Sequence, residues 1–286
     1  MSSRMARFAE CAACRPAARH RVVGRHNGRM RITLISGADG TAFARDLAAA
    51  LAPSDELTVV APIVGDHWSA WLKACPDLDG LLGAPGVPTT FAVADQLAAI
   101  NYSPAWQRVS DQAVAARLVR TELVGTGYSL SEATLAAATR AGLPYRVLPM
   151  SDDRAELRVV VDGEEPHAIH LGEYLAAPGA HSPTETVLVA EAWTVSPSVV
   201  DQLRATDVLV LGPSSRTLAI DPVLRTPGLL DALPSTVPVL VVDHDDTAPA
   251  DLVRVAGLRA DDPGAAEHVP ADAAAVAELV RRVVAS

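Results

Sequence analysis

The sequence is poor in aromatic residues and cysteine, and each shortage excludes a class of protein. Aromatic residues make up 4% of the 286 residues and hydrophobic residues 49%, so a core must consist mainly of Ala, Val and Leu. This composition is typical of buried parallel strands in an α/β protein rather than of a β-sandwich. Three cysteines cannot form a disulfide framework, and no apolar run is long enough to span a bilayer. We therefore expect a cytoplasmic protein with no membrane partner.

Lysine is also scarce, because Lys73 is the only one. The net charge of -10 is unevenly spread: residues 1–29 hold seven Arg and one Glu, which leaves 17 basic and 33 acidic residues in the remainder. An acidic body argues against a nucleic-acid partner. Any bound phosphate must therefore be held by Arg, backbone N–H groups, a metal ion or Lys73.

Residues 1–29 differ from the rest of the chain in having no apolar periodicity and no signal-peptide core. We expect a disordered or non-native extension, with Met30 as the natural start, because the stretch MRITLISG opens directly on a strand. An intact mass of the protein from its native host tests this. Cys11 and Cys14 form a CxxC pair, but no second pair completes a zinc site.

The rest of the chain predicts an α/β fold with a Rossmann-like, mostly parallel sheet. Short apolar strands alternate with helices over residues 30–84 and 185–286, which predicts the core. Residues 85–184 predict a helical and hairpin insertion. Its helices are expected over Thr90–Ile100 and Ser110–Val124, followed by a capping box at Ser129–Glu132.

Two loops could bind phosphate. The first, Gly37 to Thr41, lies between a strand and an Ala-rich helix, where backbone N–H groups and a helix N-terminus can face an anion. It is neither GxGxxG nor a P-loop, and glycine turns are common before helices. The second, Gly212 to Ser215, follows the buried strand Asp207–Leu211, at the strand end where open α/β sheets bind ligands.

An acidic stretch, Gly65–Asp79, carries Asp66, Asp77 and Asp79 shortly after the strand Leu57–Ala61. Like charges so close together repel unless something compensates them, and Mg2+ prefers such oxygen ligands. A solvated acidic turn is the alternative. On the helix Ser110–Val124, Arg117 and Arg120 share one face, either as an exposed ion-paired surface or as functional residues.

Several motifs, in this order, are similar to those of the 2-phospho-L-lactate transferase family. In actinobacteria its members act as phosphoenolpyruvate transferases in the biosynthesis of coenzyme F-420. The matching stretches are SGADGTAF (36–43), GDH and CPDLD (65–79), LVRTEL (118–123), LSEAT (130–134), LPMSDD (148–153) and LGPSSRTLAIDPVLRTPGLLDAL (211–233).

The resemblance implies a reaction. A phosphoenolpyruvyl or phospholactyl group moves from a guanosine diphosphate-linked donor to the deazaflavin Fo, with release of GMP, with Mg2+ and in a homodimer. It also implies site residues. Asp66, Asp77 and Asp79 would be catalytic, and Asp66 and Asp79 would hold the metal. The residues expected at the nucleotide are Gly37, Gly40, Thr41, Ser151, Asp152, Ser214 and Ser215.

The chain also departs from the family pattern at the donor loop, the metal site and the acceptor site. His67 replaces the second Asp of the GDD motif, and an imidazole is a poorer Mg2+ partner than a carboxylate. Ala38 and Asp39 stand where the family has Gly and a small neutral residue. The RGWG segment with its acceptor-binding Arg is missing. These changes keep open a weakened paralogue that binds a nucleotide as a regulatory or partner protein, and a purely structural role.

Overall fold

The computed structural model describes residues 29–83, 86–102, 108–242, 266–269 and 272–285. The sequence also predicts helices at 250–256 and 271–284 and an acidic segment, DHDD, at 243–246. Cys11, Cys14, the first of these helices and the acidic segment lie outside the described ranges. The second helix is present as α11 (Ala273–Ala285). No helix in the described ranges has the length and apolar character needed to cross a membrane.

The main sheet has six parallel strands in the order β11-β10-β9-β1-β2-β5. Their bounds are β1 (Arg31–Ile35), β2 (Glu56–Ala61), β5 (Arg146–Pro149), β9 (Val208–Leu211), β10 (Val239–Val242) and β11 (Ala266–Val269). In chain order this is the 3-2-1-4-5-6 arrangement of a Rossmann fold, with its switch point between β1 and β9. The predicted fold class is confirmed.

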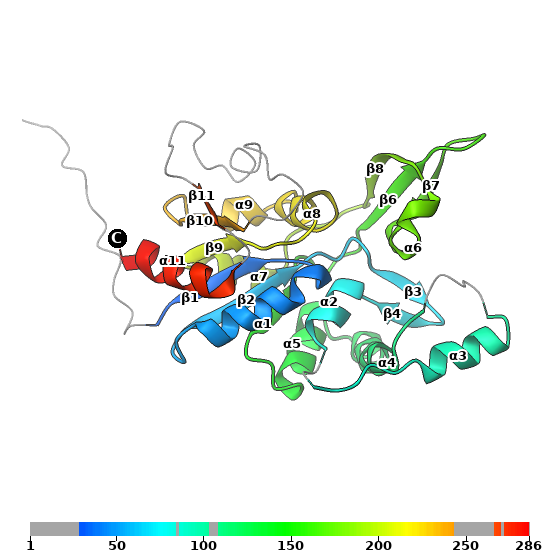
Figure 1. The fold of residues 1–286 in the computed structure, drawn as a ribbon, viewed down its shortest axis with the longest axis horizontal. Coiled ribbons are helices and arrows are strands. Elements are labelled where there is room, and N and C mark those ends of the chain that lie inside the picture. The colour runs from blue at the N-terminus through cyan, green and yellow to red at the C-terminus, as the bar shows by residue number, and fades with distance from the viewer. Residues whose placement is uncertain (1–28, 84–85, 103–107, 243–265, 270–271, 286) are drawn as a thin grey trace, which may run out of the picture.

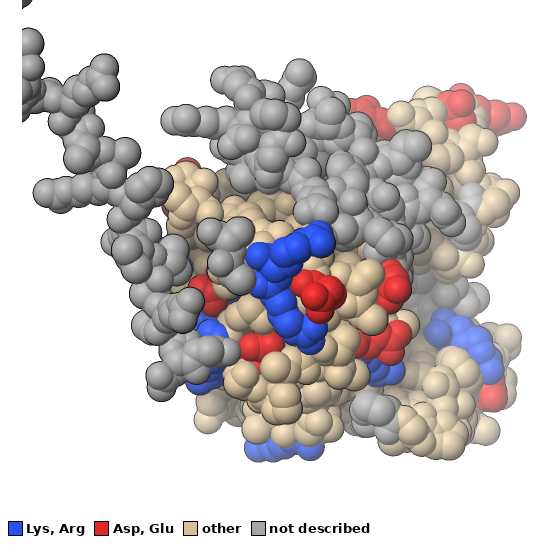
Figure 2. Space-filling model, turned by 60° about the vertical axis from the view of Figure 1, so that its left-hand side comes forward, with Lys and Arg blue, Asp and Glu red and all other residues tan. Residues whose placement is uncertain are grey.

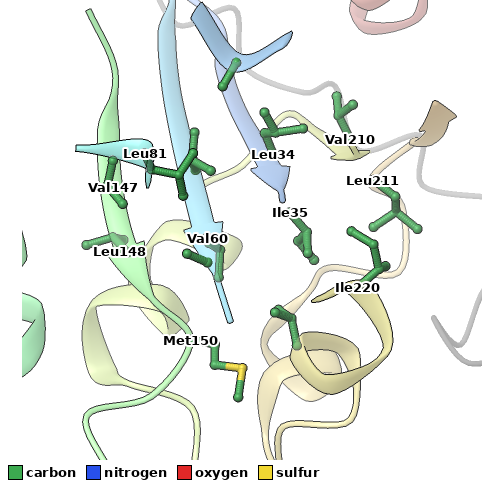
Figure 3. Packing of buried hydrophobic residues seen from close by; sticks show 14 of the residues in the cluster. Leu34, Ile35, Val60, Leu81, Val147, Leu148, Met150, Val210, Leu211 and Ile220 are labelled. Atoms are coloured by element: carbon green, nitrogen blue, oxygen red, sulfur yellow. The ribbon is translucent and has the colours of Figure 1, made fainter. Parts of the chain in front are cut away.

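The strands form because their apolar, mostly β-branched residues are buried on both faces of the sheet. All four residues of β9 and of β10 are buried. Figure 3 shows Ile35, Val60, Leu148 and Leu211, register partners from four of the strands, in one continuous layer. Helices α1 (Thr41–Ala50) and α11 lie side by side along the sheet (Figure 1), while α7 (Pro197–Arg204) packs against α9 (Leu229–Ala232).

The intervening part forms two units. The first holds the β3–β4 hairpin (His67–Ser69, Leu72–Ala74), α2 (Pro76–Leu81), α3 (Ala92–Ala99), α4 (Asp111–Gly125) and α5 (Leu130–Arg140). Ser110 caps α4, and the predicted capping box at Ser129 is confirmed. The second is a wing beyond the sheet (Figure 1), with strands β6 (Glu156–Val161), β7 (His167–His170) and β8 (Pro183–Val189), and α6 (Leu171–Ala176).

The predicted domain ranges need two corrections. Strand β5 lies inside the range 85–184 but pairs with β2 in the main sheet, because its buried Val147 and Leu148 complete the core. Strand β8 was expected in the parallel core, yet it pairs antiparallel with β6 in the wing. The fold is completed by four short helical segments: α8 (Asp221–Leu224), two 3-10 helices at Ala38–Gly40 and Pro178–Ala180, and a π-helix at Arg216–Ile220.

Charged side chains are mixed by sign on the surface that Figure 2 shows. Blue Lys and Arg side chains lie directly beside red Asp and Glu side chains on this face. The acidic excess of the sequence is therefore not gathered into one patch there. The carboxylates that matter for chemistry lie instead at the carboxyl ends of the strands.

Candidate active site

Two loops meet at the switch point of the sheet. Ile35 and Leu211 are register partners at the ends of β1 and β9. The loops that follow these two strands therefore begin at the same height of the sheet. We call Ser36–Gly40 the β1 loop and Gly212–Ser215 the β9 loop. The Ser36 and Ser214 hydroxyl oxygens are 2.9 Å apart, and the Gly37 N–H donates to Ser214 Oγ at 3.0 Å. A Cβ on Gly40 would lie 2.0 Å from Ser36 Oγ. A side chain at this position would therefore force the Ser36 hydroxyl to move.

Both loops donate an N–H group to a carboxylate of the chain itself. The Ala38 N–H donates to Asp77 Oδ1 at 2.8 Å, and the Ser215 N–H donates to Asp39 Oδ2 at 3.0 Å. Asp77 reaches the β1 loop because α2 packs closely on it: a Cβ on Gly80 would lie 2.7 Å from the Ala38 Cβ. An anionic acceptor on backbone N–H groups beside a helix N-terminus is the arrangement a phosphate would adopt.

Asp66 is buried at the end of the loop that follows β2. Its Oδ2 accepts the Cys75 S–H at 2.9 Å and lies 3.1 Å from Lys73 Nζ. Its Oδ1 is buried and has no hydrogen-bond partner. Burial raises the pKa of Asp66, although the nearby Lys73 ammonium opposes the rise. A buried carboxylate with one unsatisfied oxygen is a favourable place for a cation.

Asp77 is the carboxylate that shares this environment with Asp66. Burial raises its pKa from 3.8 to about 7, with further contributions from the negative charges of Asp66, Asp39 and Asp79. Such a cluster is stabilised when a proton or a metal ion lowers its charge. Perturbed carboxylates in a ligand-binding crevice are typical of functional sites.

Asp79 lies on α2, two residues after Asp77, and contacts two arginines of α4. Its Oδ2 is 2.9 Å from Arg117 Nε and its Oδ1 is 2.7 Å from an Arg120 terminal nitrogen. The side chains of Asp79, Arg117 and Arg120 are only 7%, 9% and 4% exposed. Arg117 and Arg120 do share one face of α4, but that face is buried. Its arginines neutralise Asp79, which differs from the predicted role of Asp79 as a metal ligand.

The described residues contain no group of three or more His, Cys, Asp or Glu side chains arranged to hold a metal ion. Mg2+, however, is commonly held by one or two carboxylates together with substrate phosphates and water. Asp66, with its unsatisfied oxygen, and the adjacent Asp77 fit that smaller donor set. His67 does not add a ligand of the expected kind, because its Nδ1 lies 3.0 Å from the Gly65 carbonyl oxygen and its ring packs on His170.

Ser151 and Asp152 have structural contacts. The Ser151 hydroxyl donates to the Thr194 carbonyl at 2.6 Å and accepts the Asp153 N–H, and Asp152 Oδ1 accepts the Ser131 N–H at the start of α5. They follow β5, the edge strand, and so lie two strands away from β1. In contrast, Gly37, Gly40 and Thr41 are brought together with Ser214 and Ser215 at the switch point.

A largely apolar pocket of about 600 Å3 lies beside the acidic residues, between the β3–β4 hairpin, α3 and α4. We call it the side pocket. Leu97, Val109 and Val114 line it together with Arg108 and Arg117. Arg117 therefore contacts both the side pocket and Asp79.

Backbone strain is concentrated at the same pocket. In the described ranges, the non-glycine residues with positive φ are Ala70 (49°), Trp71 (64°) and Asn101 (54°). Ala70 and Asn101 line the side pocket. Left-handed backbone at non-glycine residues is costly and is often found at ligand sites. Neither the pocket nor the role of Gly80 was predicted from sequence. The glycine directly after CPDLD was an available signal, whereas the pocket depends on helices distant in sequence.

Comparison with known proteins gives a consistent result. The profile of the family described as 2-phospho-L-lactate transferase CofD matches residues 32–248. The phosphoenolpyruvate transferase of Streptomyces griseus subsp. griseus is 35% identical over 227 residues, which cover 74% of this chain and 71% of that protein. The enzyme of the same name from Kitasatospora aureofaciens is 33% identical over 219 residues, which cover 71% and 68% of the two chains.

Solved structures show the same fold at low identity. Protein BH3568 from Bacillus halodurans is similar with a TM-score of 0.58 and 14% identity, over 85% of this chain and 80% of that one. A second structure of BH3568, described as a member of the upf0052 family, has a TM-score of 0.56 and 14% identity over 79% of this chain and 75% of that one. At this identity the likeness concerns the fold alone.

Proposed function

Because the chain belongs to the 2-phospho-L-lactate transferase family, we propose that it is a transferase of coenzyme F-420 biosynthesis. It transfers a phosphoenolpyruvyl or phospholactyl group from a guanosine diphosphate-linked donor to the hydroxyl of Fo and releases GMP. The observation that carries the proposal is the meeting of the β1 and β9 loops at the switch point, with Asp66 and Asp77 beside them.

The donor diphosphate is proposed to lie against these loops. Open α/β sheets bind ligands at this position, and the Ala38 and Ser215 N–H groups already hold carboxylates there. Gly37, Gly40 and Thr41 shape one side of this site, and Ser214 and Ser215 the other. Since Asp77 and Asp39 occupy the N–H groups, the donor must replace at least one of them.

Mg2+ is proposed to be held by Asp66 and Asp77 rather than by Asp66 and Asp79. The metal would supply positive charge at the phosphate oxygens where negative charge develops during transfer. The residues of the chain contribute the rest. Lys73, 3.1 Å from Asp66, opposes the rise that burial causes in the pKa of that carboxylate. Arg117 and Arg120 neutralise Asp79, so that α2 can present Asp77 to the β1 loop.

The side pocket is proposed to receive the flat ring system of the acceptor. Its volume is within the range of small-molecule sites, which are mostly apolar with a few polar groups. Arg108 and Arg117 provide cationic groups in a chain that lacks the acceptor-binding Arg of the RGWG segment. With the ring in this pocket, the acceptor hydroxyl would face the acidic residues across Arg117.

Calorimetry with GDP and Mg2+, followed by an assay of GMP release with Fo and the donor, tests the proposal. We expect binding and turnover in the wild type, and loss of metal-dependent turnover in Asp66→Ala with retained folding. Turnover that survives Asp66→Ala would place the metal elsewhere. Absence of nucleotide binding under all conditions would exclude the proposal.

A second candidate is a protein that binds the nucleotide without transfer and acts as a regulatory or partner protein. One observation favours it: Asp39, which departs from the family pattern, occupies the Ser215 N–H. Tight GDP binding without any GMP release from the donor would select this alternative. Homodimer formation remains a proposal from family analogy, and sedimentation would test it.

A further inference from the structure

Asp39 joins the two loops of the donor site although it is exposed. Its Oδ2 accepts the Ser215 N–H across the switch point, while its own backbone belongs to the turn Ala38–Gly40 that precedes α1. The two residues are 176 positions apart in the chain. Among the described residues, this is the one hydrogen bond between a carboxylate of the β1 loop and the backbone of the β9 loop.

The position of Asp39 has consequences for an incoming phosphate. A phosphate oxygen that used the Ser215 N–H would have to replace the carboxylate of Asp39, and the displaced charge would remain on the same short loop. The negative charge of Asp39 already contributes to the raised pKa of Asp77. Two unit charges about 4 Å apart repel by ~1 kcal/mol in water and by several times more where solvent is partly excluded. The charge of Asp39 therefore weakens binding of a diphosphate without a cation. It weakens binding much less when a cation neutralises the phosphates.

We propose that Asp39 is a specificity-determining residue of the donor site, which favours a nucleoside diphosphate whose phosphates a divalent cation neutralises over the same diphosphate without a cation. The inference rests on the proposed function, because it requires the donor at the β1 and β9 loops. It also gives Asp39 a role that differs from ligation of the metal. Its carboxylate accepts the Ser215 N–H. In the part of the chain that the structure describes, two buried carboxylate oxygens have no hydrogen bond, Asp66 Oδ1 and Asp79 Oδ1, and the second is ion-paired with Arg120 at 2.7 Å.

Calorimetry on the full chain with three ligands tests this: GDP with EDTA, GDP with Mg2+, and guanosine. Asp39→Asn keeps an oxygen that can accept the Ser215 N–H but removes the charge, and Asp39→Ala removes both. Asp46→Asn is the matched control, since Asp46 is exposed on α1 and the charge change is the same. All three changes are at exposed positions and should leave the fold intact.

We expect Asp39→Asn to tighten binding of metal-free GDP about tenfold, which corresponds to ~1.4 kcal/mol. Binding of GDP with Mg2+ should change much less, and guanosine not at all, because it carries no phosphate. Asp39→Ala should behave alike, and Asp46→Asn should match the wild type.

Three results would overturn the inference. Equal GDP affinities in wild type and Asp39→Asn would remove any role for this charge. Weaker binding of GDP with Mg2+ in Asp39→Asn would make Asp39 a metal ligand instead. An equal gain in affinity for metal-free GDP in Asp46→Asn would show that the effect comes from the net charge of the protein and not from the position of Asp39. If neither wild type nor variants bind GDP, the proposed function itself fails, and that outcome differs from all three.

Discussion

Replacement of Asp79 by Asn tests whether this carboxylate holds α2 against α4 or binds a metal. Asp79 lies in the first turn of α2 and contacts Arg117 and Arg120 at 2.9 and 2.7 Å. Asn has nearly the same size but no charge. The change leaves two buried guanidinium groups without their counter-charge, while the backbone and the packing stay almost the same.

The expected cost follows from the burial of the three side chains. All are 9% exposed or less, and breaking a buried ion pair by removing one partner costs about 3–5 kcal/mol. Arg120 also donates to the Lys73 carbonyl at 3.2 Å, which offsets part of the loss. We therefore expect the free energy of unfolding to fall by about 3 kcal/mol. Urea denaturation followed by circular dichroism would measure it, with an unchanged m-value.

The matched control is Asp95→Asn. Asp95 pairs with Arg108 at 2.6 Å, but these side chains are 61% and 58% exposed. Exposed pairs contribute about 0–1 kcal/mol, so this variant should be close to the wild type. A loss below about 1 kcal/mol in Asp79→Asn would refute the structural role. So would a folded Asp79→Asn protein that binds GDP normally but has lost its Mg2+ dependence, since Asp79 would then be a metal ligand.

Three further predictions concern other parts of the site. Asp77 is expected to make stability depend on pH: its pKa in the folded protein is about 7 against an ordinary 3.8, so the folded state holds a proton that the unfolded state releases. The free energy of unfolding should therefore fall by about 3 kcal/mol between pH 4 and pH 7, and urea titrations should show a flatter profile for Asp77→Asn. Gly80→Ala should weaken GDP binding about tenfold in calorimetry, because the new Cβ would lie 2.7 Å from the Ala38 Cβ and displace the β1 loop. A normal GDP affinity would show that α2 does not position the loop. Ala98→Trp, which fills part of the side pocket, should raise the KM for Fo and leave GDP affinity unchanged, and an unchanged KM would place the acceptor elsewhere.

Sequence patterns predicted the local elements well, because they depend on neighbouring residues. Burial on both faces of a parallel sheet requires continuous apolar runs such as Val208–Leu211, and helix starts require caps such as Ser110 and Ser129. The same kind of information failed for β5 and β8. Strand β5 has four residues (RVLP), and strand β8 has seven that mix polar and apolar types (PTETVLV). Neither local pattern indicates which strand lies beside it.

The motifs also identified the right loops for the candidate site but not the partners of each side chain. Asp66, Asp77 and Asp79 lie within one stretch of sequence, and their spacing gives no reason to assign them different partners. In the structure they differ: Asp79 contacts two arginines of α4, Asp77 accepts an N–H of the β1 loop, and Asp66 keeps a buried oxygen without a partner.

The sequence by itself therefore determined which segments form the sheet and the family to which they belong, because periodicity and motif order are properties of the chain. Only the tertiary structure decided which of the three carboxylates pairs with arginines and where the apolar side pocket lies. The side pocket and the Asp39 contact join residues far apart in sequence. Charge pairing and cavity shape arise only when such segments pack together.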